Sequence, residues 1–118
     1  MVIDVNELFS EDSLLVTRYN LTDEQVHEIR LFYECFHNYK KVGKDLEVII
    51  PCVLLVLNLN KFKIDLKSEV RYLVSVLFDE SEIEMNRRQS KIYVNFMKFA
   101  DDYQECGWYY NWKQHNNN

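Results

Sequence analysis

The sequence predicts an all-α protein, a compact bundle of about four to five helices in a single domain. Hydrophobic residues make up 47% of the 118 residues, which is enough to build a core. The chain has only two glycines and one proline, whereas sheet-rich folds usually need more of both in their turns. Apolar residues also recur at helical intervals. We expect one helical domain over residues 1–113 and a disordered polar tail over 114–118.

The first third of the chain predicts two short helical segments and one long helix. Apolar residues near the N-terminus indicate a short helix, and Ser13–Tyr19 indicates another turn or two. A long helix is predicted over residues 22–42. Thr22 and Gln25 form a capping box at its start, an apolar stripe follows, and Gly43 supplies the left-handed residue that ends it.

Residues 46–66 leave two structures open. The run Val48–Leu57 is apolar on every side, which fits either a central helix or a buried strand. Its β-branched residues favour a strand, and the alternation that follows would allow a β-hairpin. Pro51 argues against a central strand and is tolerated in the first turn of a helix. We favour the helix because its neighbours are helical, and keep the hairpin as the alternative.

The second half predicts two amphipathic helices. Asp65 can cap the first, and Ser81 with Glu84 forms a capping box at the start of the second. Apolar and large residues of the second helix step by four and three, which is a heptad seam. The seam consists of Met85, Gln89, Ile92, Phe96, Phe99 and Tyr103.

Charge and cysteine usage predict a cytoplasmic protein without a membrane segment. The formal charge of −5 argues against general affinity for phosphate backbones or anionic membranes. Three cysteines without a CxxC pair fit reduced thiols in the cytosol. The longest apolar run is about half of what a bilayer span needs. The amino-acid usage also suggests an AT-rich genome, such as that of a phage, a virus or a mobile element.

Two Glu-x-x-His motifs, at Glu24/His27 and Glu34/His37, have the spacing of ligands in metal-binding bundles. Both lie on one predicted helix, where ten residues correspond to a rise of about 15 Å and a net rotation of roughly 80°. They cannot close on one metal ion within a monomer. Residues two apart on a helix, such as Cys35 and His37, point about 200° away from each other. We therefore expect no metal and no cofactor.

The remaining reactive groups do not predict an enzyme. Two isolated glycines cannot form a phosphate-binding loop, and no serine-centred nucleophile motif is present. Arg87, Arg88 and Lys91 could contact a phosphate at the start of the last helix. Nearby glutamates would offset this charge. Nucleic-acid binding is therefore a less favoured alternative.

An aromatic set follows the last predicted helix and is the strongest sign of a partner. It comprises Trp108, Tyr109, Tyr110 and Trp112. Tryptophan and tyrosine are enriched where proteins bind one another. The alternative is that this segment folds back and covers one end of the bundle.

The sequence favours a non-catalytic binding protein that covers a surface of another, unidentified protein. Its size and composition suit an inhibitor or modulator, such as a phage or viral protein directed at a host factor, or an immunity protein. One alternative is a homo-oligomer, for instance a homodimer, that associates through the heptad seam. A second is a nucleic-acid regulator, and a third is a metal enzyme that uses the histidine motifs.

Overall fold

The computed structural model describes residues 5–40, 45–105 and 114, and within these ranges the chain contains helices and no strand. The predicted all-α bundle of four to five helices is confirmed. The elements in chain order are η1 (Val5–Phe9, a 3-10 helix), α1 (Leu14–Tyr19), α2 (Asp23–Lys40), α3 (Asp45–Leu59), α4 (Leu66–Leu77), α5 (Glu82–Asp102) and η2 (Tyr103–Glu105, a 3-10 helix). The predicted polar tail lies outside the described residues except for Gln114, so it stays a prediction.

Capping residues expected from the sequence begin helices α2, α4 and α5. The Thr22 N–H donates to Gln25 Oε1 at 2.9 Å, and the Gln25 N–H donates back to Thr22 Oγ1 at 3.2 Å. This is the predicted capping box of α2. Asp65 and Ser81 are the N-caps of α4 and α5. The predicted stop at Gly43 lies outside the described residues.

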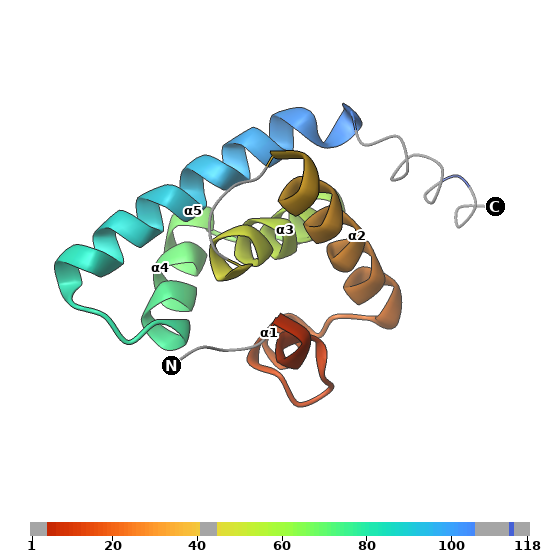
Figure 1. Cartoon of the computed structure of the whole chain (residues 1–118). Helices are drawn as coiled ribbons and strands as arrows, with labels where there is room; N and C mark the ends of the chain where they lie inside the picture. The colour runs from red at the N-terminus through yellow and green to blue at the C-terminus, as the bar shows by residue number, and fades with distance from the viewer. Residues whose placement is uncertain (1–4, 41–44, 106–113, 115–118) are drawn as a thin grey trace.

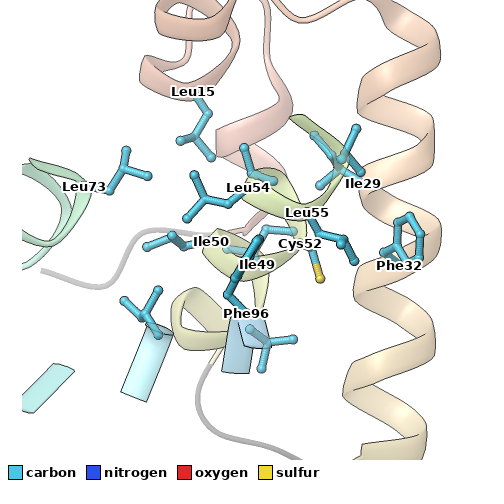
Figure 2. Close-up of a cluster of buried hydrophobic side chains, with 14 of the residues drawn as sticks. Leu15, Ile29, Phe32, Ile49, Ile50, Cys52, Leu54, Leu55, Leu73 and Phe96 are labelled. Atoms are coloured by element: carbon cyan, nitrogen blue, oxygen red, sulfur yellow. The ribbon is translucent and has the colours of Figure 1, made fainter. Parts of the chain in front are cut away.

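Helix α3 forms the centre of the molecule. Of the two structures left open for residues 46–66, the helix is therefore the one that forms. Figure 1 shows α3 between α2 and α4, with α5 on one side and α1 on the other. Every residue from Leu46 to Leu57 is buried. Figure 2 shows α3 side chains directed at Leu15 of α1, Phe32 of α2 and Leu73 of α4. The run is apolar on all sides because other helices surround it.

Pro51 lies in the second turn of α3, so the expected first-turn position is wrong. The helix begins at Asp45, six residues earlier. Because proline has no N–H, the carbonyl of Glu47 loses its usual helical donor four residues on. The buried Asn95 of α5 donates to this carbonyl from Nδ2 at 3.1 Å. A side chain of α5 thus replaces a backbone hydrogen bond of α3.

A polar cluster joins α1 to α4 across 50 residues of sequence. Arg18 donates to both carboxylate oxygens of Glu69, at 3.0 and 3.1 Å, and the Tyr19 hydroxyl donates to the same carboxylate at 2.6 Å. The Arg18 guanidinium also lies 3.7 Å from the ring centroid of Tyr72. This bidentate pair fixes the small N-terminal helix against the rest of the bundle.

Stacked aromatic rings join α2 to α5. The rings of Phe36 and Phe99 are 4.0 Å apart between centroids and nearly parallel, and Phe32 lies 5.7 Å from Phe36. All three side chains are fully buried. Burial of such a side chain contributes about 1.5–3 kcal/mol, so this stack is one of the stronger contacts between α2 and α5.

None of the helices in the described part of the chain combines the length and the apolar character needed to cross a membrane. Cys35 and Cys52 are buried and form no disulfide within the described residues, and Cys52 is a core residue as its place in the apolar run predicts. Cys106 lies outside the described residues.

Candidate interaction surface

The predicted heptad seam of α5 faces the interior of the molecule. Ile92, Phe96 and Phe99 are buried, and Met85 and Tyr103 at the two ends pack partly against the core. The helix uses this face to contact α3 and α4. The seam is therefore occupied within one chain, and a dimer could use it only if the core opened.

The opposite face of α5 carries a second series with the same spacing, which the sequence analysis did not identify. We call it the outer ridge, and it consists of Ile83, Arg87, Ser90, Val94, Met97 and Asp101. It starts two residues before the buried seam, which corresponds to a rotation of about 200° around the helix. Three apolar residues on it are strongly exposed: Ile83 at 68%, Val94 at 50% and Met97 at 46%.

Three cations mark one edge of the outer ridge, and one of them, Arg87, belongs to the ridge itself. Arg87, Lys91 and Lys98 are exposed, and we call them the basic flank. On a helix with 3.6 residues per turn, the three project within about 40° of one another. No ion pair or hydrogen bond joins any of them to another described residue. Lys98 is exposed to solvent, and Arg87 and Lys91 are exposed at the edge of a polar pocket that Glu84 also lines.

Arg88 differs from its neighbours because two carboxylates hold it. Its guanidinium pairs with Glu47 of α3 and donates from Nε to Glu80 at 2.6 Å. It also lies 4.2 Å from the ring centroid of Phe78. The Glu47 side chain is only 6% exposed, so this ion pair is largely removed from water. Sequence reasoning treated Arg88 as a phosphate contact and missed its partner 41 residues earlier.

The three predicted phosphate contacts do meet in one polar pocket of about 260 Å³. Its lining consists of Glu47, Glu80, Glu84, Arg87, Arg88 and Lys91. Three carboxylates balance three cations there, and Arg88 is already neutralised. An anion entering the pocket would gain from two cations and meet repulsion from nearby carboxylates. Phosphate binding stays a sequence-based prediction.

A shallow groove of about 480 Å³ lies on the other side of the outer ridge, between α4 and α5. It is lined by Lys67, Val70, Asn86, Gln89, Ser90, Tyr93 and Val94. Arg71 of α4 donates to two of these lining residues, to Asn86 at 2.7 Å and to Gln89 at 3.3 Å. The outer ridge thus has a groove on one side and positive charge on the other.

The histidine motifs lie on the surface of α2. His27 and His37 are exposed, and Cys35 is buried, so Cys35 and His37 point apart as expected. The His37 ring stacks on Tyr33 with centroids 5.3 Å apart. Among residues 5–40, 45–105 and 114, no group of three or more histidine, cysteine, aspartate or glutamate side chains could hold a metal ion.

The aromatic residues Trp108, Tyr109, Tyr110 and Trp112 lie outside the described residues. Their predicted role as a partner surface, or as a cover for the bundle, stays a prediction. No family model matches the chain, and neither the curated proteins nor the solved structures contain a significant match.

Proposed function

We propose that this chain is a non-catalytic protein-binding module, an inhibitor or modulator that acts by covering a surface of another protein. The observation that carries the proposal is the outer ridge. Isolated apolar residues are common on protein surfaces, but Ile83, Val94 and Met97 follow one line along one helix. Removing exposed apolar side chains of this kind from water stabilises the complex with a partner.

Two observations favour a different protein over the alternatives. The buried seam of α5 is already used inside the chain, which argues against the homo-oligomer that this seam suggested. A nucleic-acid surface would combine cations with polar side chains that read bases or phosphates, whereas the outer ridge places apolar side chains beside its cations. The cytoplasmic location and the phage, viral or toxin-immunity origin remain proposals that rest on composition.

Site-specific photocrosslinking in the cell from which the gene comes would test the proposal. A photoreactive phenylalanine replaces Val94 in one variant and Val76 in a second. Val76 is a matched control because it is 45% exposed but lies on α4. We expect one protein to be crosslinked from position 94 and not from position 76. Identical products from both positions, or only crosslinks between copies of the chain, would contradict the proposal.

A further inference from the structure

The spacing of the outer ridge indicates the kind of element that would cover it. Ile83, Arg87, Ser90, Val94, Met97 and Asp101 step by 4, 3, 4, 3 and 4. Such a line runs nearly parallel to the helix axis and matches a second helix that crosses at about 20°. From Ile83 to Met97 the line is about 21 Å long at 1.5 Å per residue. A helix of about four turns would cover it.

The charges of α5 indicate which helix fits. No acidic residue occurs between Glu84 and Asp101, whereas this stretch contains four cations, Arg87, Arg88, Lys91 and Lys98. Glu47 and Glu80 neutralise Arg88, and the other three form the basic flank. Glu84 lines the same pocket as Arg87 and Lys91, but no ion pair joins any of these three cations to another described residue. A helix lying on the outer ridge would bring its own flanking residues close to these three cations. Acidic residues there would be attracted, and basic residues would be repelled.

A second copy of this chain does not supply that chemistry. If two α5 helices paired in antiparallel orientation through their outer ridges, two-fold symmetry would place each basic flank beside the other. Lys91 and Lys98 of both copies would then lie on the same side and repel one another. In a parallel pair, each basic flank would face Asn86 and Tyr93, neither of which supplies a carboxylate. An antiparallel pair would bring Glu84 of one copy near Lys98 of the other, but Lys91 would still lie near Lys91, so neither arrangement neutralises all three cations.

We propose that the outer ridge and basic flank of α5 bind an amphipathic helix of another protein. The apolar stripe of that helix lies against Ile83, Val94 and Met97, and its acidic residues lie beside the basic flank. The groove between α4 and α5 receives larger apolar side chains at the other edge, next to Tyr93 and Val94. This inference rests on the proposed function and adds the chemistry of the partner.

A displayed library of amphipathic helical peptides tests this inference on the full chain. Its apolar heptad positions vary among Leu, Ile, Val and Met, and its flanking positions vary among Glu, Gln and Lys. We expect peptides with Glu on one flank to be enriched. The triple variant Arg87→Glu, Lys91→Glu, Lys98→Glu should enrich peptides with Lys instead. A peptide selected on the natural chain should bind this variant about tenfold more weakly, because three surface charge pairs are reversed.

Matched variants separate binding from folding. Glutamate has nearly the helix propensity of lysine and arginine, so the triple variant should keep the circular dichroism spectrum of the natural chain. Lys63→Glu changes one exposed cation outside α5 and should leave peptide binding unchanged. Val94→Asp with Met97→Asp should abolish binding of the selected peptide, and Val76→Asp should not.

Four outcomes would overturn the inference. Enrichment without a charge preference, or no enrichment over the Val94→Asp, Met97→Asp variant, would show that no acidic helix is recognised. A dimer in sedimentation that Val94→Asp dissociates would identify a second copy as the occupant. Salt-sensitive binding of a short DNA duplex that requires the basic flank but not Val94 would identify nucleic acid. If the library fails while crosslinking at position 94 captures one protein, the proposed function stands and only the partner chemistry is wrong.

Discussion

At the scale of single residues, the structure depends on charges that are removed from water and paired. Arg88 is the main example, since its guanidinium lies between Glu47 and Glu80 and above the ring of Phe78. A buried pair of this kind adds little net stability compared with apolar residues, but the loss of one partner leaves the other charge in an apolar environment. The pair therefore acts as a constraint on how α3 and α5 meet.

Replacement of Arg88 by methionine should lower the free energy of unfolding by about 3 kcal/mol, because the buried Glu47 carboxylate then loses the guanidinium that pairs with it. Adding Glu47→Gln to this variant should restore part of the loss. Urea denaturation at neutral pH measures both effects. A loss below about 1 kcal/mol for Arg88→Met would mean that solvent reaches this carboxylate more easily than its burial indicates.

The carboxylate of Glu69 links stability to pH. Partial burial by itself raises the pKa of Glu69, but hydrogen bonds from Arg18 and Tyr19 outweigh it, and the pKa lies below its ordinary value. Partial burial, followed by the hydrogen bond to Glu69, raises the pKa of Tyr19 above its ordinary value. At neutral pH, Glu69 is therefore ionised and Tyr19 is protonated, which is the state that the hydrogen bonds require.

Glu69→Gln should lower the free energy of unfolding by about 1 kcal/mol at pH 7, a modest value because Arg18 is partly exposed. The folded pKa is below the unfolded value of about 4.3, so the contribution is present above that pH and is lost as the pH falls further. Denaturation curves of both proteins at pH 7 and pH 3 measure the difference. If the difference is the same at both pH values, the ionised carboxylate is not its source.

At the scale of elements, α3 shows where sequence reasoning reaches its limit. Capping residues are local, so Thr22, Asp65 and Ser81 could be identified before the structure was known. The run Val48–Leu57 has no periodicity, because a helix surrounded on all sides buries every residue. The choice between helix and strand depended on neighbours that no local pattern describes. The same limit applies to Glu47 and Arg88, which only the packing of α3 on α5 brings together.

The hydrogen bond between Asn95 and the Glu47 carbonyl is a second feature of α3 that depends on tertiary structure. It stands in for the N–H that Pro51 lacks. Asn95→Leu should therefore cost about 2 kcal/mol, since it leaves a buried carbonyl without this donor. In a Pro51→Ala background, the restored backbone N–H can donate to the same carbonyl, and Asn95→Leu should cost much less.

A double-mutant cycle over Pro51→Ala and Asn95→Leu, measured by chemical denaturation, gives the coupling directly. We expect a coupling of about 1 kcal/mol or more. Additive effects of the two substitutions would show that the hydrogen bond from Asn95 to the Glu47 carbonyl does not compensate for the N–H that Pro51 lacks. A control cycle pairs Pro51→Ala with Ser90→Ala, because Ser90 is on the exposed side of α5.

The two faces of α5 differ in how well the sequence identifies them. The buried seam could be identified from the sequence because large apolar residues mark it. The outer ridge has the same spacing, but only three of its six residues are apolar, and a solvated face is the ordinary interpretation of such a pattern. The exposure of Ile83, Val94 and Met97 in the structure makes that pattern a candidate surface. The aromatic set from Trp108 to Trp112 lies outside the described residues, so its role as a partner surface remains a prediction from the sequence.

At the scale of the whole molecule, one hydrophobic core surrounds α3, and the short helix α1 is a small N-terminal unit that contributes Leu15 and Tyr19 to it. Helix α1 has six residues, and only Leu15 and Tyr19 within it are buried. The Arg18–Glu69 pair is its main polar connection to α4. A unit with so few buried contacts can open while the rest of the molecule stays folded.

Hydrogen exchange of backbone amides would test this division. Amides of α3 should exchange most slowly, because they open only when the whole molecule unfolds, and amides of α1 should exchange faster through local opening. Phe99→Leu weakens the aromatic stack between α2 and α5 and should lower global stability by about 1 kcal/mol. Exchange in α3 should then be about fivefold faster, while exchange in α1 stays unchanged, because α1 opens without disturbing Phe99.

Glu69→Gln provides the complementary case. The hydrogen bonds from Arg18 and Tyr19 to Glu69 are lost both when α1 opens alone and when the whole chain unfolds. The substitution should therefore accelerate exchange in α1 and α3 by similar factors. The contrast between the two variants therefore identifies α1 as a separate unit, because a general loss of stability would affect both helices in both variants. If Phe99→Leu accelerated exchange in α1 as much as in α3, the chain would unfold as one unit, and the division would be wrong.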